Sequence, residues 1–454
     1  MKKEKIGLIG AILMGIGCIV GSGIFGTLPT VANDIGPGVI WALIGAAFVV
    51  VLRSISRMYT SAALPTSASQ FMYATKLFHP YVGAFISINT ILTPTMISLF
   101  GVLFAMYFQP LFPGLEVNAT ILSVGLLLVF TVIAWFGNKS TVWISNIMVV
   151  LLLIAIALYI FIGIPNIDGD NISFGSIVKP GIGVSSIAAA IGVLTSSLSG
   201  ASSVAEIADD IEKPEKNVPI ALILCPVIVA VIYILMAVVT IGVIPSAEVE
   251  SLSQVAERFM SPALLKFFIV GGPIAGIVTS LVPVALACVA AFDYSSRTMV
   301  YPALLSKKNR HGVAYISLFI ASAIAMGICA TGATFGVVMT VFSFANTLGE
   351  LPNTLSPIPA YNKYPKTCDN SSAHMSAGLA KTLAVITFLI CVYLCVQMIL
   401  TLDAKAVAGI FAVYIVGYAY FFIRIKYLKG KGVDLIAEMK KPYEPWEEKE
   451  ASYN

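Results

Sequence analysis

Long apolar segments follow one another along most of this chain, and they constrain its fold more than any other feature. Hydrophobic residues make up 58% of the 454 residues and charged residues only 11%, against about 25% charged residues in soluble domains. A run of about 20 apolar residues has the length of a membrane-spanning helix. Because a bilayer offers the backbone no hydrogen-bond partners, each such segment must satisfy its own backbone as a helix. The pattern therefore predicts an all-α polytopic membrane protein.

We expect twelve transmembrane helices in one domain over residues 1–424, followed by a cytoplasmic tail over residues 425–454. The tail is charged and carries Trp446, which favours a position at the membrane interface, with a regulatory plug as the alternative. The predicted helices span residues 6–30, 37–57, 80–109, 119–136, 142–163, 182–206, 217–245, 265–292, 312–331, 334–361, 378–401 and 404–424.

The basic residues indicate which side of the membrane each loop faces. An even number of helices places both termini on one side, and nearly all of the 27 Lys and Arg residues fall there. Positively charged loops stay in the cytoplasm, so we expect both termini inside and the chain in the cell membrane. This role accounts for the net charge of +4 without a nucleic-acid partner. The basic residues expected on the opposite face are Lys179, Arg258, Lys266 and Lys405.

The first apolar segment is interrupted at Gly21, Ser22 and Gly23. Two glycines around a serine weaken the helical hydrogen-bond ladder at mid-membrane depth, where irregular backbone is tolerated only beside a cavity. The free N–H groups at the start of the second half-helix would attract an anion. The interruption therefore indicates a pathway for a small solute, with a substrate carboxylate near residues 21–23.

A second interruption lies at a similar depth in the sixth predicted helix. Residues 196–203 are Ser-Ser-Leu-Ser-Gly-Ala-Ser-Ser, and hydroxyl residues with a glycine do not favour an uninterrupted helix. Two interrupted segments at corresponding positions of two halves are the strongest sequence indication of a transporter site. Close helix packing through small residues is the alternative explanation for either break alone.

Four motifs in order along the chain resemble those of the amino acid–polyamine–organocation superfamily. Its G-S-G-I/V-F break in helix one matches residues 19–25, and its stretch from the helix-six break to a K-N-P-x-K-N-x-P turn resembles residues 200–219. Residues 65–73 resemble its P-x-S-G-G motif, and residues 295–297 match a motif after helix eight. Together these motifs are specific for the superfamily and weak for the substrate.

The resemblance implies a LeuT-like fold with a five-plus-five inverted repeat. Repeat one would cover about residues 6–163 and repeat two about residues 182–361, with two peripheral helices over residues 378–424. It also implies a symporter or exchanger that binds an amino acid or related amine between broken helices one and six. Such a permease works by alternating access, in which one helix bundle rocks against the other.

The resemblance also implies roles for residues beside the two breaks. The backbone N–H groups of Ser22 and Gly23 would bind the substrate carboxylate. The carbonyl groups of Ile19, Ser196 and Ser199 would accept hydrogen bonds from the α-ammonium group. The other candidate substrate-binding residues are Gly21, Gly200, Ala201 and Ser202.

The chain departs from the family where many relatives carry an aromatic gate. Ser196 stands at that place, and Ala201 and Ser202 stand where many relatives have an aromatic or acidic residue. The lost bulk predicts a larger or more open pocket, or a gate formed by another aromatic residue. The candidates are Phe100, Tyr107, Phe342 and Phe344.

Coupling residues of some relatives are also missing. Leu152 falls near the helix-five lysine of some proton-coupled relatives, so lysine-based coupling is not expected. A sodium site would need oxygen ligands from helix eight, whose apolar part offers only the hydroxyl groups of Thr279 and Ser280. We therefore rank sodium coupling below proton coupling or exchange.

Arg53 and Arg57 lie four residues apart near the end of the second predicted helix. The simplest interpretation is that both side chains snorkel to the cytoplasmic headgroups. The alternative is a gate in which they pair with an acidic residue after the helix-six break. The candidates for that acid are Glu206, Asp209 and Asp210.

Glu350 lies near the middle of the tenth predicted helix, on one face with Asn346 and Asn353. An ionisable group at bilayer depth is a candidate functional site because its burial is costly. It could carry a coupling proton, or it could bind the cationic end of a diamine or basic amino acid, as in a polyamine transporter. The alternative is a protonated, structural hydrogen-bond donor to a neighbouring helix.

Other functional classes fit the sequence less well. It contains no nucleophile–base set and no G-x-x-x-x-G-K-[ST] phosphate loop, so we expect neither an enzyme nor nucleotide-driven transport. Its seven Cys and three His residues show no metal-ligand spacing, and no cofactor or metal is expected. A channel is not expected either, because the sequence has no repeated selectivity loop. A nutrient sensor that binds the ligand without transporting it is the remaining alternative, although the sequence contains no recognisable effector module.

Overall fold

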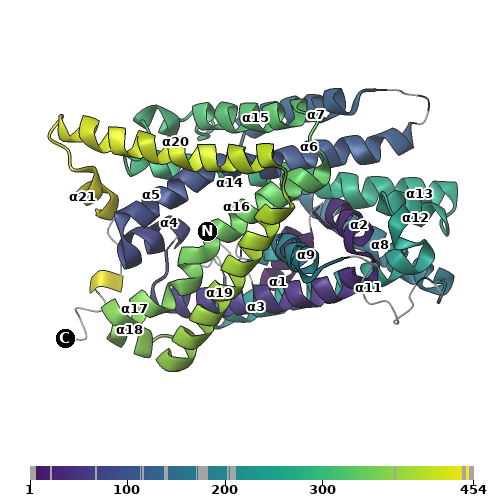
Figure 1. Cartoon of the computed structure of the whole chain (residues 1–454), viewed down its shortest axis with the longest axis horizontal. Coiled ribbons are helices and arrows are strands. Elements are labelled where there is room, and N and C mark those ends of the chain that lie inside the picture. The colour runs from purple at the N-terminus through teal and green to yellow at the C-terminus, as the bar shows by residue number, and fades with distance from the viewer. Residues whose placement is uncertain are drawn as a thin grey trace.

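Helices occupy each apolar range expected from the sequence in the computed structural model of the chain (Figure 1). Apart from isolated bridges, one between Lys308 and Ala314 and one at Ile211, the regular secondary structure of the described residues is helical. The structure describes residues 7–20, 23–66, 69–112, 114, 117–137, 142–169, 171, 182–201, 204, 211–372, 375–441 and 446–448.

The first half of the chain contains two interrupted helical segments. One lies between α1 and α2, and the other is the 3-10 turn η3 between α5 and α6. In chain order the main elements are α1 (Leu8–Val20), α2 (Gly23–Ile35), η1 (Gly36–Gly38), α3 (Val39–Ala63), α4 (Ser69–Met72), the π-helical η2 (Tyr73–Phe78), α5 (Pro80–Asn89), η3 (Thr90–Leu92), α6 (Pro94–Phe108), α7 (Ala119–Trp135) and α8 (Val142–Gly163).

The second half of the chain also contains a break and a π-helical element. A break follows the first helix, and a π-helical element precedes the third long one. The main elements are α9 (Val184–Ser197), η7 (Ser199–Ala201), α11 (Pro214–Val243), η9 (Ser246–Glu248), α12 (Leu252–Glu257), α13 (Pro262–Ile269), the π-helical η10 (Val270–Ile274), α14 (Ala275–Arg297), η11 (Ala303–Ser306), α15 (Tyr315–Ala330), α16 (Phe335–Leu355), α17 (Pro357–Lys363), α18 (Pro365–Asp369), α19 (Ala377–Thr401), α20 (Ala404–Lys429) and α21 (Leu435–Lys440).

Proline sets two boundaries that hydropathy alone misses. Pro94 and Pro357 each begin a helix, because proline lacks an N–H and fits the first helical turn. The predicted helix over 80–109 is therefore divided at η3, and that over 334–361 is divided after Leu355. In contrast, α3 continues past its predicted end, because the Thr60 hydroxyl is buried and lies 2.7 Å from the Ser356 hydroxyl.

Among the residues that the structure describes, seven helical stretches are long and apolar enough to cross a membrane. Large apolar side chains are exposed on them, such as Phe161 of α8 at 74% exposure, as expected of a surface that faces lipid. The chain is therefore a multi-pass membrane protein. The stretches are Gly23–Ala63, Pro80–Leu111, Ile147–Asn166, Lys216–Val243, Pro262–Arg297, Ala377–Thr401 and Ala404–Lys429.

Two groups of helices each pack internally and are bridged by α16, which packs against α3, α6 and α9. In the first group α11 packs against α1 and α3, and α3 also packs against α9. In the second group α6 packs against α7, α14 and α15. Figure 1 shows the two groups as separate layers, with α16 between them and α20 along the outside. The interrupted ends of α1 and α9 thus face the second group and α16.

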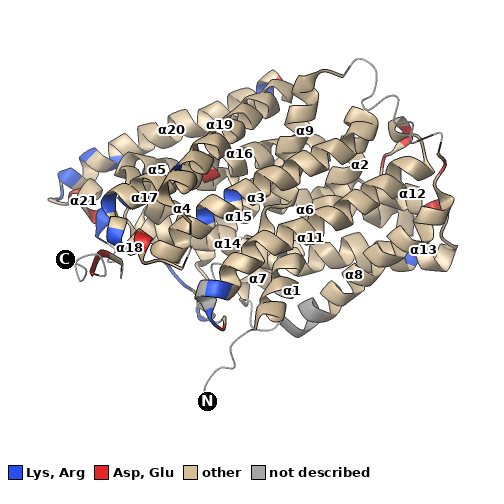
Figure 2. Ribbon diagram, turned by 90° about the horizontal axis from the view of Figure 1, so that it is seen from below, with Lys and Arg blue, Asp and Glu red and all other residues tan. Residues whose placement is uncertain are grey.

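Charged residues are unevenly distributed along the bundle (Figure 2). Lys and Arg residues gather at the end that carries α17, α18 and α21, which we call the basic end. Acidic residues mark the opposite end, beside α12. Between the two ends, α3 contributes Arg53 and Arg57 and α16 contributes Glu350.

The segment after α20 packs back onto the basic end. Trp446 is 1% exposed, and its ring centroid lies 6.4 Å from that of Tyr73. Lys76 Nζ lies 2.9 Å from Glu447 Oε1. The interfacial position predicted for Trp446 is wrong, because apolar residues of α3, η2 and α17, including Tyr59, form a protein site for its ring.

Candidate functional site

The first interruption lies where the sequence predicts it, since α1 ends at Val20 and α2 begins at Gly23. The buried Tyr233 hydroxyl of α11 donates a hydrogen bond of 3.2 Å to the Ile19 carbonyl, which holds the open end of α1. The Thr27 hydroxyl donates to the Gly23 carbonyl at 2.8 Å. A Cβ added at Gly23 would meet no atom within 4 Å, so α2 begins beside open space.

The second interruption also lies within its predicted segment. α9 ends at Ser197, and after Leu198 the chain continues as the 3-10 turn η7. The Ser199 hydroxyl donates to the Thr195 carbonyl at 2.6 Å. The Ser197 hydroxyl donates to Thr27 Oγ1 at 3.2 Å, which connects α9 directly to the start of α2. The two breaks are therefore neighbours in space.

A cavity of about 220 Å³, which we call the central cavity, lies between the two interruptions. Its break wall is formed by the ends of α1, α2, α9 and η7, and includes a Ser196 hydroxyl that is buried with no hydrogen-bond partner in the described chain. Five predicted substrate-binding residues line this wall: Ile19, Gly23, Ser196, Ser199 and Gly200. Gly21, Ser22 and Ser202 lie outside the described residues, as does the side chain of Ala201.

The opposite side of the central cavity is formed by one face each of α6, α14 and α16. The lining residues of α6 recur at i, i+3, i+4 and i+7, the spacing of a single helix face. Sequence reasoning missed most of them, because apolar faces of this spacing are equally typical of lipid contact or packing. This apolar wall comprises Met96, Leu99, Phe100, Leu103, Val284, Phe335, Met339 and Phe342, with Ser280 and Asn346 beside them.

An aromatic residue that the sequence analysis did not single out separates the central cavity from a larger one. The outer cavity has a volume of about 640 Å³ and is lined by residues near the α12 end, including Asn33 and Glu250. Phe335 and Met339 line both cavities. A Cβ added at Gly26 would lie 2.3 Å from Cζ of Phe335, so the ring packs directly on the backbone of α2.

The four aromatic gate candidates have different positions. Phe100 and Phe342 line the central cavity, as predicted for a replacement gate. The Tyr107 hydroxyl instead donates to the Phe25 carbonyl at 2.8 Å, and Phe344 packs with residues such as Met398 of α19. Phe335 is the first residue of α16 and has no distinctive sequence context. Its role between the two cavities is therefore visible only from its contact with Gly26.

A third cavity, which we call the inner cavity, adjoins the central cavity on the side of the basic end. Its volume is about 150 Å³, and Ser199 and Asn346 line both cavities. Arg57 Nη2 lies 2.9 Å from Glu350 Oε1, with the two side chains 14% and 12% exposed. The side chain of Arg53 is buried beside this pair.

The contacts of Arg57 correct the prediction that it snorkels to the headgroups. A carboxylate of α16 compensates its charge inside the bundle, so the side chain has no need to reach water. The gate interpretation expected Arg57 to pair with Glu206, Asp209 or Asp210, and the structure pairs it with Glu350. Those three acidic residues lie outside the described residues.

Glu350 accepts hydrogen bonds from several helices. Gln70 of α4 makes a short hydrogen bond to Oε1, and Asn353 Nδ2 lies 3.4 Å from Oε2. With the bond from Arg57, Glu350 joins α3, α4 and α16. The predicted alternative of a protonated hydrogen-bond donor does not match this set of donors around its oxygens. Glu350 lines the inner cavity and does not line the central one.

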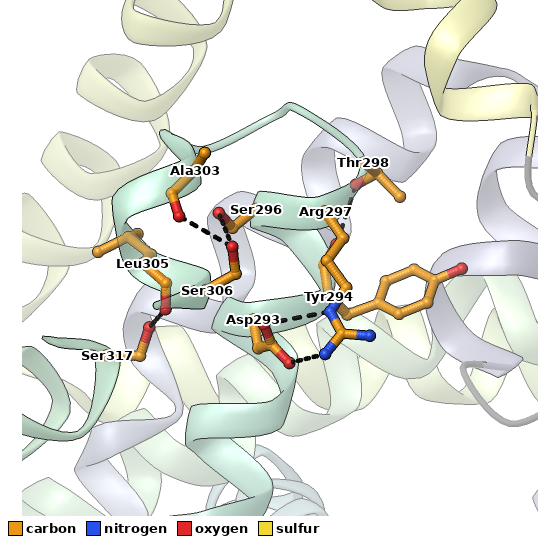
Figure 3. Close-up of polar contacts among 9 residues, drawn as sticks. All are labelled: Asp293, Tyr294, Ser296, Arg297, Thr298, Ala303, Leu305, Ser306 and Ser317. Carbon is orange, nitrogen blue, oxygen red and sulfur yellow. Dashed lines mark hydrogen bonds and ion pairs between the residues drawn. The ribbon is translucent and has the colours of Figure 1, made fainter. Parts of the chain in front are cut away.

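The motif over residues 295–297 forms the last residues of α14 (Figure 3). It lines none of the three cavities. The Ser296 hydroxyl donates to the Pro302 carbonyl at 2.6 Å, which fixes the turn toward η11. Arg297 Nη2 lies 2.8 Å from Asp293 Oδ2, and the two residues form an i, i+4 ion pair on the last turns of α14.

Comparison with known proteins agrees with these features. A family model described as amino acid permease matches residues 6–426. The methylthioribose transporter of Bacillus subtilis (strain 168) is 26% identical over 316 residues, which cover 65% of this chain and 68% of that protein. The branched-chain amino acid permease BcaP of the same organism is 21% identical over 338 residues, covering 69% and 72%. The mouse Asc-type amino acid transporter 1 is 28% identical over 287 residues, covering 59% and 52%.

The family match extends over nearly all of the chain and includes both interruptions and every helix that lines the central cavity. It confirms the resemblance drawn from the four sequence motifs. Members of such a family move solutes and are not enzymes. The chain belongs to the amino acid permease family.

Proposed function

We propose that this protein is a secondary transporter that moves an amino acid or a related amine across the cell membrane by alternating access. The observation that carries the proposal is the central cavity between the two interruptions. The N–H groups at the start of α2 favour a carboxylate, and the carbonyl groups at the ends of α1 and α9 favour an ammonium group. Both charges of an amino acid thus find partners without a charged side chain.

In this proposal Ser22 and Gly23 bind the carboxylate, and the carbonyls of Ile19 and Ser196 accept hydrogen bonds from the ammonium group. The open space beside Gly23 supports the first contact. The unpartnered Ser196 hydroxyl supports a polar ligand at the second. Because Tyr233 already donates to Ile19, that carbonyl has one lone pair left for substrate.

We also propose twelve transmembrane helices, ten of them in a five-plus-five inverted repeat. Matching interruptions support the repeat: α1–α2 corresponds to α9–η7, and η2 before α5 corresponds to η10 before α14. Residues 1–424 would then form one transmembrane domain, with α19 and α20 peripheral and the tail beginning at about residue 425.

The distribution of charge supports an orientation with both termini in the cytoplasm. Lys and Arg gather at the basic end, and positively charged segments stay on the cytoplasmic side (Figure 2). In that orientation the outer cavity faces the exterior, and the Arg57–Glu350 pair closes the inner side of the pathway.

Recognition of a polyamine through Glu350 has weaker support. Its carboxylate already binds Arg57, Gln70 and Asn353, and Arg53 adds a second positive charge beside it. A cationic substrate group would therefore have to displace Arg57. Coupling to protons or exchange with a second substrate remains part of the proposal, and a pH gradient across liposomes distinguishes the two.

The test is counterflow of radiolabelled amino acids into liposomes that contain the purified protein. Gly23→Leu would fill the open space at the start of α2, and we expect it to abolish counterflow while leaving the protein folded. Gly409→Leu on the exposed face of α20 is the matched control, because its side chain also meets no protein atom. Equal counterflow in both variants would contradict the proposed site.

A further inference from the structure

The two walls of the central cavity differ in chemistry. The break wall presents small residues, hydroxyl groups and backbone ends, which suit the charged groups at the Cα of an amino acid. The apolar wall presents aliphatic, thioether and aromatic side chains from three helices. A ligand that contacts both walls must therefore be polar at one end and apolar at the other.

No charged side chain lines the central cavity among the described residues. The charged residues of the adjoining cavities are Arg53, Arg57 and Glu350 in the inner cavity, and Asp34 and Glu250 in the outer one. Arg57 and Glu350 are engaged with each other at 2.9 Å. A charged substrate side chain in the central cavity would lose its hydration and gain no counter-ion there.

Side chains of the apolar wall are also held in place by packing. Leu103 and Met339 are at least 97% buried, and Phe335 is fixed against Gly26. A rearrangement that brought a charged residue to the cavity would have to displace these packed groups. The apolar character therefore belongs to the cavity itself and does not depend on mobile side chains.

We propose that the transported amino acid carries an uncharged, apolar side chain of the branched aliphatic, thioether or aromatic kind. The side chain lies against α6, α14 and α16, while the carboxylate and ammonium groups contact the break wall. This inference rests on the proposed amino acid transport. It excludes basic and acidic amino acids, as well as amines without a carboxylate, from the preferred substrates.

Near-isosteric ligands test the proposal without any mutation. Counterflow would be measured with radiolabelled L-methionine, L-phenylalanine, L-lysine and L-glutamate, each in competition with unlabelled norleucine, lysine, methionine and glutamine. Norleucine differs from lysine by the charged group alone. We expect the concentration for half-inhibition to be at least about 100-fold lower for norleucine than for lysine, because a charge would be buried without a partner.

The outcomes separate this inference from the proposed function. Efficient counterflow of methionine or phenylalanine with weak competition by lysine and glutamine supports both. Counterflow of lysine or glutamate that equals or exceeds that of methionine overturns the apolar class and leaves amino acid transport standing. Counterflow of no labelled amino acid overturns both proposals.

A gain-of-function variant provides an independent arm. Val284→Asp places a carboxylate on the apolar wall one turn beyond Ser280, and we expect it to raise lysine counterflow relative to methionine. Phe342→Ala removes a ring from the same wall and enlarges the central cavity, so it should shift the preference toward larger aromatic side chains. Phe161→Ala, on the exposed surface of α8, is the control and should leave both ratios unchanged. Ratios for Phe342→Ala that match those of the control would overturn the placement of the substrate side chain.

Discussion

The central and inner cavities share Ser199 and Asn346, yet their chemistry is opposite. The central cavity combines apolar side chains with backbone ends and has no charged side chain among the described residues. The inner cavity holds two arginines and a glutamate in a smaller volume. Under the proposed function these two cavities have different roles: the central cavity recognises the ligand, and the inner cavity closes the pathway.

The physical reason for this division lies in how each interaction depends on conformation. Helix-end dipoles and apolar contacts bind a zwitterion without a buried counter-ion that would have to separate during transport. An ion pair between α3 and α16 instead favours the conformation in which the two helices are close. Opening the inner side would break that pair in a low-dielectric environment, which is costly unless water enters.

The largest expected effect comes from the charge balance of the inner cavity. Glu350→Gln would leave Arg57 buried beside Arg53 without a counter-ion, and we expect a loss of about 3–5 kcal/mol in the free energy of unfolding. Unfolding in mixed micelles by titration with SDS measures it. Replacing both partners, Arg57→Met with Glu350→Met, should recover much of the loss. An unchanged free energy for Glu350→Gln would show that the pair is not desolvated.

The next effect concerns the tail that packs onto the basic end. η2 contacts Trp446 through Tyr73, and the preceding α4 contacts Glu350 through Gln70. Trp446→Ala should cost about 3 kcal/mol because it empties an apolar protein site, and it should expose the tail to proteases. Tyr427→Ala, at an exposed position of α20, is the control. Equal proteolysis of the two variants would argue against a docked tail.

A smaller effect is expected where α16 approaches α5. A Cβ at Gly349 would lie 2.5 Å from Nδ2 of Asn89, which itself donates to the Ala345 carbonyl and accepts from Tyr414. Gly349→Ala should therefore lower the free energy of unfolding by about 1–3 kcal/mol. Gly327→Ala on α15 meets open space and should be neutral or slightly stabilising. The same response at both glycines would contradict the close approach.

The smallest effect is expected at the ion pair outside both cavities. Arg297 is 56% exposed, so its pair with Asp293 is screened by solvent (Figure 3). Arg297→Ala should change the free energy of unfolding by less than about 1 kcal/mol, and the change should shrink further at high salt. A loss as large as that of Glu350→Gln would remove the distinction between buried and exposed pairs.

Much of the fold could be predicted from the sequence because it depends on local properties. Hydropathy located the long apolar helices, and α8 matches its prediction over residues 142–163. Short helices such as α12 and α21 lie outside the predicted ranges. Runs of Gly and Ser predicted both breaks, since these residues weaken helices wherever they occur. The errors arose at Pro94 and Pro357, and at the end of α3, where burial of Thr60 against Ser356 extends the helix.

The candidate site could be predicted in part. The break wall was identified by its composition, as at Ser196 and Gly200, but the apolar wall was not. Phe335 and Met339 resemble any other apolar residue of a membrane helix until their neighbours are known. Glu350 was recognised as costly to bury, while its partner Arg57 lies 293 residues away in the chain.

The sequence by itself determined a multi-pass helical permease with two unwound segments and an excess of positive charge at one end. These properties follow from hydropathy, helix propensity and motif order, which act within a few residues of one another. Only the tertiary structure decided that Arg57 binds Glu350, that Phe335 rests on Gly26 and that Trp446 is buried by protein. Each of these contacts joins distant segments, so its energy depends on packing that no local pattern encodes.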